Sequence, residues 1–277
     1  KFEDLYGVYP WWNDGFKLTE TKMPHGLCME HQSGISMTDA YINIFKGINL
    51  ILVHEISHEW WGNSTTAFDY ADLWLHEGFA EYSGPLFVET NMGKEYYKRY
   101  IYNFYNSTKN KRPVIKPYDV GYNNLIHRDD QDIYNKGALL LHTLRMELNN
   151  DSLFFKTLKL FQQRFAKSNI TSHMFISFFN EETKIDFTPY FDVYLKQITP
   201  PILEYHINKS QSDSITLEYK WANKLPENFK LKINFWNEKK LNPLYPTSTI
   251  QQLKFPSKDR YVFDIETSGY FILKERK

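Results

Sequence analysis

The feature that most constrains this chain is a pair of histidines four residues apart, His54 and His58, which follow an apolar run. Apolar residues recur here at helical spacing, so we predict a helix over about residues 44–62. On a helix, residues four apart lie on one face, one turn above the other. The two imidazoles can therefore bind one metal ion together, and Glu55 projects beside them.

A histidine pair at this spacing has two explanations. The H-E-x-x-H pattern is typical of zinc peptidases, in which the glutamate, here Glu55, acts as a general base toward a metal-bound water. A buried helix whose histidines hydrogen-bond to each other or to backbone carbonyls would show the same letters. Because a catalytic zinc usually has three protein ligands, the first explanation requires a third ligand from elsewhere in the chain.

Glu77 is the candidate third ligand. Eighteen residues separate it from His58, and it lies in the sequence Trp-Leu-His-Glu-Gly-Phe-Ala, whose apolar letters disfavour a plain surface acid near a helix start. We predict that Asp72 is the N-cap of a helix running from Leu73 toward residue 91, with Glu77 in its second turn. An antiparallel pair of helices could then bring the carboxylate to the two imidazoles.

Composition argues against several other classes of protein. The 277 residues carry 33 basic and 33 acidic side chains, a balance that does not favour a nucleic-acid surface. One cysteine, Cys28, excludes an intrachain disulfide framework and a cysteine-rich metal site. No run of eighteen apolar residues is present, so we expect no membrane span. The sequence leaves the compartment open, and we favour an extracytoplasmic one, periplasmic or secreted.

The chain changes character near residue 200. Before this point, short extended pieces within residues 16–38 predict two strands with a tight turn. Helical patterns predict helices at about residues 94–107, 129–149, 151–166, 172–182 and 187–198. After this point, alternating runs predict an antiparallel sandwich. We therefore expect an α+β protein with a mostly helical domain and a small sheet over residues 1–199, followed by a small β-sandwich over residues 200–277.

Two further motifs lie at defined distances from the histidine pair. Leu27-Cys-Met-Glu-His31 precedes His54 by about twenty residues, and Tyr134-Asn-Lys-Gly137 follows Glu77 by roughly sixty. In order and spacing, the whole set resembles the gluzincin aminopeptidases, the family that contains aminopeptidase N and leukotriene-A hydrolase. The resemblance extends from about residue 3 to about residue 205, and it implies a thermolysin-like fold for the helical domain.

The resemblance implies a catalytic role for each residue of the metal motifs. One Zn2+ per chain would be bound by His54, His58 and Glu77. Glu55 would take a proton from the attacking water and deliver it to the leaving amine. Tyr134 would donate a hydrogen bond to the developing oxyanion, an interaction often worth about 3 kcal/mol.

The resemblance also implies how a substrate is held. Glu30 would pair with the free α-amino group of a peptide, which restricts cleavage to the first residue. The backbone around Cys28 and Met29 would pair with the peptide as an edge strand. The expected partner is therefore a peptide with a free amino terminus.

Several positions depart from the family pattern. Leu27, Cys28 and His31 replace a glycine, a small residue and an asparagine that the family usually has. We expect Cys28 to be a packed residue and not a nucleophile, because the water mechanism needs none. His76 replaces the usual asparagine before Glu77, and we expect it to be an outer hydrogen-bond partner and not a fourth metal ligand.

The resemblance leaves three functions open. In the family a β-rich domain precedes the catalytic one, and we expect this missing domain of the same protein to be a partner of the present chain. A zinc aminopeptidase is the function that we favour. A fragment that binds zinc and peptide without turnover is the second, and epoxide or ester hydrolysis on the same metal site is the third.

Overall fold

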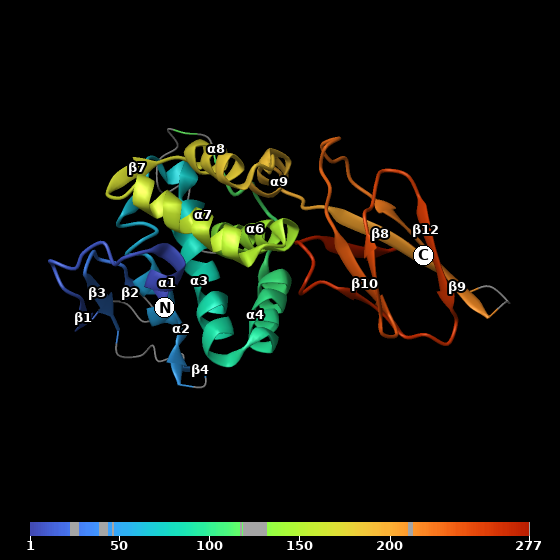
Figure 1. Cartoon of the computed structure of the whole chain (residues 1–277), viewed down its shortest axis with the longest axis horizontal. Coiled ribbons are helices and arrows are strands. Elements are labelled where there is room, and N and C mark those ends of the chain that lie inside the picture. The colour runs from blue at the N-terminus through green and yellow to red at the C-terminus, as the bar shows by residue number, and fades with distance from the viewer. Residues whose placement is uncertain are drawn as a thin grey trace.

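The computed structural model describes residues 1–22, 28–38, 44–45, 47–116, 118, 132–209 and 213–276. Helices form most of the chain up to about residue 196 and strands form the remainder, which gives an α+β protein (Figure 1). The helices are α1 (Phe2–Tyr6), α2 (Leu50–Ser57), α3 (Trp74–Met92), α4 (Lys94–Ser107), α6 (Asp132–Leu148), α7 (Asp151–Arg164), α8 (Ser172–Thr183) and α9 (Thr188–Phe191).

These bounds confirm most of the helices predicted between residues 94 and 182. At the predicted helix over 187–198, α9 is followed instead by a π-helical turn, Asp192–Lys196. At the predicted helix over 129–149, residues 129–131 lie outside the described part of the chain and α6 begins at Asp132. The Asp132 carboxylate accepts hydrogen bonds from the backbone amides of Lys109 and Lys111, which fixes the start of α6 against the segment after α4.

The metal-motif helix α2 is shorter than the sequence predicts. Strands β4 (Ile44–Phe45) and β5 (Ile48–Asn49) pair as a hairpin before it, and Gly47 has a φ of 87°. Asn49 then caps the helix, because its side chain accepts a hydrogen bond from the amide of Leu52 at 3.0 Å. The predicted start near residue 44 was therefore wrong: a positive-φ glycine and a strong N-cap place the start at Leu50.

The start of α3 also differs from the prediction. Asp72 ends a 3₁₀ turn, Tyr70–Asp72, which is capped by Asp69 through a 2.8 Å bond from the amide of Ala71. The buried Asp72 carboxylate accepts instead from the hydroxyl of Ser172 on α8. Helix α3 begins at Trp74 with Leu73 at its N-cap, so Glu77 lies in its first turn. Asp72 as N-cap and Glu77 in the second turn were both wrong.

Helices α3 and α6 cross where two glycines face each other. A Cβ atom added at Gly137 would lie 2.9 Å from the Cα of Gly78, and one added at Gly78 would lie 3.0 Å from the Cα of Gly137. The backbones therefore touch directly, which only glycine allows. Glu77 on α3 and Tyr134 on α6 lie close enough for the charge of Glu77 to act on the Tyr134 phenol.

Near the amino terminus, β1 (Lys17–Glu20), β2 (Cys28–Met29) and β3 (Gly34–Met37) form a small sheet with β3 in the centre. The two strands predicted here are present as β1 and β3. They pair in parallel, so the prediction that a tight turn joins them as a hairpin was wrong, and only β2 pairs antiparallel with β3. The turn expected at 24–26 lies outside the described residues. Strand β2 is an edge of the described sheet. A further parallel pair joins β6 (Thr65–Ala67) to β7 (Ser168–Ile170).

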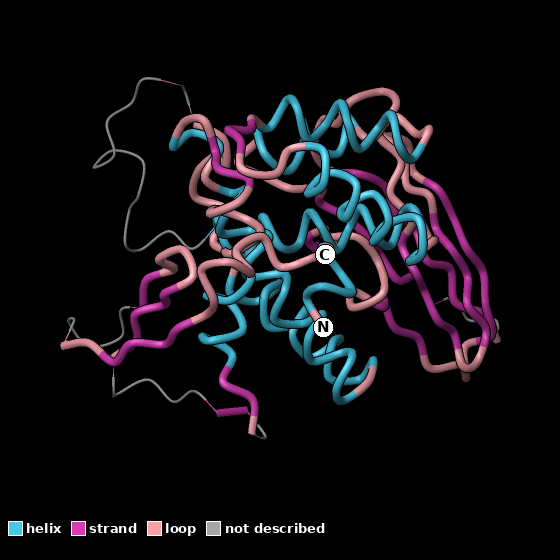
Figure 2. Tube along the Cα trace, turned by 60° about the vertical axis from the view of Figure 1, so that its left-hand side comes forward, coloured by secondary structure: helices cyan, strands magenta, loops and turns pink. Residues whose placement is uncertain are grey.

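The last third of the chain forms two sheets, and Figure 2 shows these strands on the opposite side of the molecule from β1–β3. One contains, in spatial order, β12 (Gln251–Pro256), β9 (Ser214–Trp221), β8 (Ile202–Lys209) and β14 (Ile272–Glu275). The other contains β11 (Lys240–Leu244), β10 (Ile233–Asn237) and β13 (Tyr261–Asp264). All their pairs are antiparallel except β8 with β14, so the expectation of antiparallel pairing throughout was wrong at that edge.

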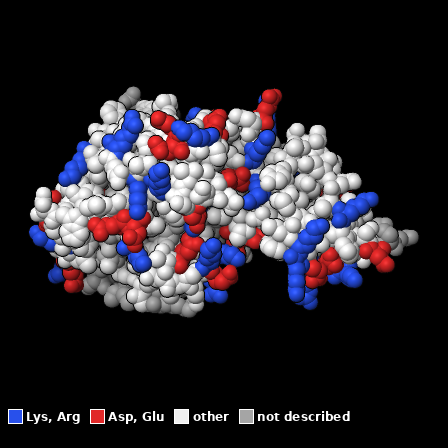
Figure 3. All heavy atoms as spheres, viewed as in Figure 1, with Lys and Arg blue, Asp and Glu red and all other residues white. Residues whose placement is uncertain are grey.

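This strand-rich part packs firmly on the helices. The amide of Tyr270 donates to the Thr143 hydroxyl on α6 at 2.9 Å, and a Cβ at Gly269 would collide with Thr143 and Leu231. Among the residues that the structure describes, no helix has both the length and the apolar character to cross a bilayer. On the face in Figure 3, acidic and basic side chains are interspersed, as the charge balance of the sequence suggests.

Candidate metal centre

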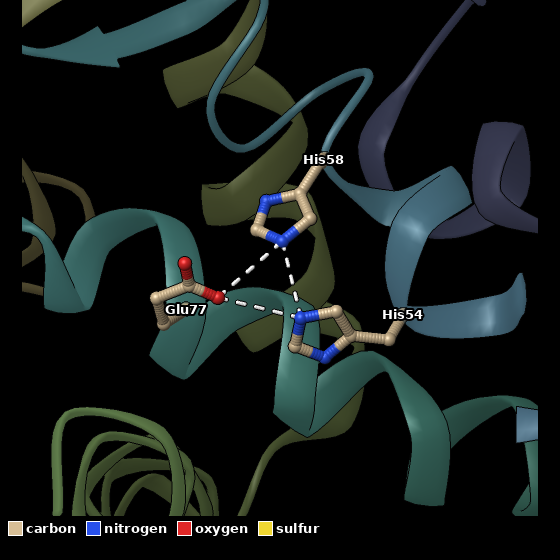
Figure 4. Close-up of side chains that lie close together, drawn as sticks. All are labelled: His54, His58 and Glu77. Carbon is tan, nitrogen blue, oxygen red and sulfur yellow. Dashed lines mark hydrogen bonds and ion pairs between the residues drawn. The ribbon is translucent and has the colours of Figure 1, made fainter. Parts of the chain in front are cut away.

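The three predicted ligands converge in space. His54 lies on α2, His58 is the C-cap residue directly after it, and Glu77 lies on α3; Figure 4 shows their side chains pointing toward one another. The Nε2 atoms of the two histidines lie 3.1 Å apart. The Glu77 Oε2 atom lies 3.3 Å from Nε2 of His54 and 3.4 Å from Nε2 of His58.

The triangle of donor atoms has the size that a zinc ion requires. In a tetrahedral zinc site with bonds of about 2.05 Å, ligand atoms lie about 3.3 Å apart. The three observed separations, 3.1, 3.3 and 3.4 Å, match this value. Two imidazole nitrogens and one carboxylate oxygen are also a donor set typical of a catalytic zinc, with room for a fourth ligand. The residues present therefore fit the metal that the sequence predicts.

Each histidine is held by a second hydrogen bond at its other ring nitrogen. The Nδ1 atom of His54 lies 3.1 Å from a carboxylate oxygen of Glu81, and Nδ1 of His58 lies 2.9 Å from the carbonyl of Trp61. Because both partners accept hydrogen bonds, both Nδ1 atoms carry the proton, and both Nε2 lone pairs face the triangle. Glu81 was not predicted as a site residue, although its position one helical turn after Glu77 is a signal for it.

The triangle is a place where positive charge is stabilised. Burial alone would lower the pKa of His54, but the carboxylates of Glu77 and Glu81 raise it well above its ordinary value. The pKa of His58 is also raised, because Glu77 outweighs the effect of burial. The pKa of Glu77 is lowered by the two histidines in spite of its burial. A cation placed among the three atoms meets the same attraction.

Glu55 and Tyr134 lie next to this triangle. Glu55 is buried, and burial raises its pKa, with a smaller rise from Glu30 and an opposing effect of the imidazoles. A carboxylate with a raised pKa is suited to hold a proton transiently. The ring of Tyr134 stacks on that of His54 at 6.1 Å between centroids. Burial and the neighbouring carboxylates raise the pKa of Tyr134, so its phenol stays protonated and can donate.

The predicted substrate-binding residues lie on the edge strand β2 and just after it. Met29 is 41% exposed and Cys28 is half-buried. Burial raises the pKa of the Cys28 thiol, which opposes a role as nucleophile. Glu30 follows the strand, and its charge acts on both Glu55 and His58, which places it beside the metal triangle. Leu27 lies outside the described residues.

His76 and Lys136 have structural contacts that the sequence did not specify. The Nε2 atom of His76 accepts from the amide of Ala67 at 2.7 Å, and burial lowers its pKa to about 4, so it stays neutral and binds β6. It is not part of the metal triangle. The buried Nζ of Lys136 donates to the carbonyls of Gln197 and Ile198, at 2.8 and 2.9 Å, and so ties α6 to the segment before β8.

The chain is similar in sequence to proteins named as aminopeptidases and as leukotriene A-4 hydrolase. Human endoplasmic reticulum aminopeptidase 2 is 29% identical over 150 residues, which are 51% of this chain and 15% of that protein. Leukotriene A-4 hydrolase of Xenopus laevis is 25% identical over 241 residues, which are 79% of this chain and 38% of that protein. The chain thus spans well under half of the length of these relatives.

Solved structures show the same fold. Aminopeptidase A of Legionella pneumophila, in complex with aspartic acid, aligns over 94% of this chain and 32% of its own, with a TM-score of 0.73 and 14% identity. The M1 zinc metallopeptidase of Deinococcus radiodurans aligns over 72% of this chain and 43% of its own, with a TM-score of 0.60 and 22% identity. Residues 29–194, more than half of the chain, match the peptidase family M1 domain, and the chain therefore belongs to this family.

Proposed function

We propose that the protein is a zinc-dependent aminopeptidase, which hydrolyses the first peptide bond of substrates with a free amino terminus. The observation that carries the proposal is the triangle of His54, His58 and Glu77 donor atoms, whose edges of 3.1–3.4 Å fit one zinc ion. Membership of peptidase family M1 and the relatives named as aminopeptidases support it. We further propose a thermolysin-like catalytic domain over residues 1–199 and a β-sandwich over 200–277.

The chain's own residues divide the chemical work. When bound, zinc supplies a Lewis acid that polarises the carbonyl and lowers the pKa of water. Glu55 takes the proton of the attacking water and returns it to the leaving amine, for which a buried carboxylate with a raised pKa is suited. The protonated phenol of Tyr134 donates to the oxygen on which negative charge develops. Glu30 binds the α-amino group of the substrate, and β2, an edge strand of the described sheet, holds the peptide backbone.

The proposal is tested by measuring zinc content and hydrolysis of a panel of aminoacyl amides in parallel. We expect one zinc ion per chain in the unmodified protein and in Glu55→Gln, but loss of turnover only in the variant. Glu77→Ala, the matched ligand variant, should lose zinc as well. Zinc loss in Glu55→Gln would show that Glu55 is structural. Bound zinc without turnover in the unmodified protein would favour a zinc- and peptide-binding fragment that requires a further domain.

A further inference from the structure

Two side chains just beyond α2 reach across to the turn that follows β2. The Asn63 side-chain amide donates to the carbonyl of Glu30 at 2.8 Å. The Glu59 carboxylate accepts from the amide of Ser33, at 2.9 Å to one oxygen and 3.1 Å to the other. The side chains of Asn63 and Glu59 also hydrogen-bond each other. Together these contacts hold both ends of the turn 30–33.

The same two residues are fixed to the metal helix. The amide of Asn63 donates to the carbonyl of His58 at 2.9 Å. Glu59 follows His58 directly, and its carbonyl accepts from the indole of Trp11 at 3.2 Å. Each end of the connection is therefore anchored, one on a metal ligand and the other on the turn that carries Glu30.

This arrangement contains two energetically unfavourable features, a buried carboxylate and a left-handed backbone conformation. Glu59 is fully buried, and a buried carboxylate is unfavourable unless it receives hydrogen bonds. Ser33 has a φ of 55°, a left-handed conformation that a residue with a Cβ adopts rarely. The turn is closed by the amide of Gly34, which donates to the carbonyl of His31. A buried charge thus stabilises an unfavourable turn next to Glu30.

We infer that Glu59 and Asn63 are positioning residues that set the distance between the Glu30 carboxylate and the metal triangle. That distance decides which peptide bond reaches the reacting centre once an α-amino group is bound to Glu30. The inference rests on the proposed function and deepens it, because it assigns selection for substrates with a free amino terminus to a connection between two motifs. Neither residue touches the substrate.

The test uses the zinc-loaded protein and two hydroxamates that differ only in the amino group, leucine hydroxamate and 4-methylpentanoyl hydroxamate. Asn63→Asp keeps the size of the side chain but replaces the donor by an acceptor. We expect this variant to bind leucine hydroxamate about tenfold more weakly, which is the effect of one lost hydrogen bond. Its affinity for the second compound should stay within about twofold of that of the unmodified protein. Zinc content should stay at one ion per chain. Glu59→Ala should behave in the same way.

Three controls separate positioning from folding. Glu59→Gln retains an oxygen that accepts from the amide of Ser33, so it should restore most of the affinity lost in Glu59→Ala. In a Glu30→Ala background, Asn63→Asp should add nothing, since it acts through Glu30. If Asn63→Asp does not fold, Asn63→Ser, which cannot reach the Glu30 carbonyl, replaces it.

Two results would overturn the inference while the proposed function stands. One is equal weakening of both hydroxamates in Asn63→Asp. The other is a preference for leucine hydroxamate that disappears in Glu30→Ala but survives in Asn63→Asp. If Glu30→Ala itself leaves that preference intact, the amine-binding role of Glu30 is wrong, and the inference about Glu59 and Asn63 is wrong with it.

Discussion

The crossing of α3 and α6 gives the sharpest prediction about how the fold supports the site. Gly137→Ala would place a methyl group 2.9 Å from the Cα of Gly78, whereas carbon atoms in contact lie about 3.5–4.0 Å apart. The helices must therefore separate locally by about 0.6–1.1 Å. Neither side can relieve the contact by a rotamer change, because the atoms that meet belong to the backbone.

The expected loss of stability follows from two opposing effects. Overpacking costs up to about 3 kcal/mol where nothing flexible can yield. Replacing glycine by alanine inside a helix gains about 1 kcal/mol. We therefore expect Gly137→Ala to lower the free energy of unfolding by about 2 kcal/mol. The effect on turnover should be larger, up to about a hundredfold, because Glu77 and Tyr134 lie close to the crossing on opposite helices and would move apart.

The assay is urea denaturation of the zinc-free protein, which removes metal binding from the measured stability, together with kcat/KM of the zinc-loaded protein. Gly84→Ala on α3 is the control, since a Cβ there meets no atom within 4 Å. Pro85 follows Gly84 and offsets part of the gain in helix propensity, so the control should stay within about 1 kcal/mol of the unmodified protein.

A double variant tests the reasoning more strictly. Once one methyl group has separated the helices, a second at the same crossing meets less resistance. Gly78→Ala combined with Gly137→Ala should therefore cost less than the sum of the single variants. Strictly additive losses, or a Gly137→Ala protein as stable and active as Gly84→Ala, would show that the two backbones do not touch as described.

Three other changes have defined outcomes. Glu81→Gln should weaken zinc binding about 10- to 100-fold, measured by competition with a chelator, because the partner of His54 loses its charge; unchanged affinity would contradict this. Burial raises the pKa of Glu147 to about 6, so the folded state holds this proton more tightly than the unfolded state. The stabilisation by Glu147 is then present below about pH 4.5 and is lost as the pH rises through 6, a change in the free energy of unfolding of about 2 kcal/mol. Urea titrations at pH 4.5 and 7.5 should show this change in the unmodified protein but not in Glu147→Gln. Arg145→Met, which leaves two carboxylates without their buried partner, should cost about 3–5 kcal/mol, whereas Lys98→Met in a half-exposed ion pair should cost less than about 1; similar losses would refute the argument from burial.

The metal triangle was predictable because each part of it is encoded locally. The four-residue spacing of His54 and His58 needs only helical geometry, and Glu77 needs only a second helix that returns to the first. Element starts were less predictable, since several residues can act as cap. Asp69 and Asp72 both precede α3, but neither caps it: Asp69 caps the 3₁₀ turn before the helix, and Asp72 bonds to Ser172, a hundred residues further along the chain.

The residues that the sequence did not reveal are those whose partners are distant in the chain. In the sequence, nothing distinguishes Glu59 from a surface acid beside the metal motif. Its role depends on the hydrogen bond that its carboxylate accepts from the amide of Ser33, 26 residues before it. Glu81 is an intermediate case, because its spacing from Glu77 puts it on the right face of α3, but only the crossing of α2 brings His54 to it. Local periodicity cannot supply such contacts, since they depend on which elements meet in the fold.

The motif around Tyr134 shows how packing between helices can require particular residues at a fixed spacing. Gly137 lies one turn after Tyr134 and is needed where α6 meets α3, and Lys136 bonds the carbonyls that precede β8. These two contacts fix the rotation of α6 about its axis and its position along that axis. They therefore also fix the position of the Tyr134 phenol beside His54. Both contacts come from Lys136 and Gly137, and neither involves the Asn135 that lies between them and Tyr134. A Lys136→Met variant removes one of these anchors and should therefore disturb the stacking of Tyr134 on His54.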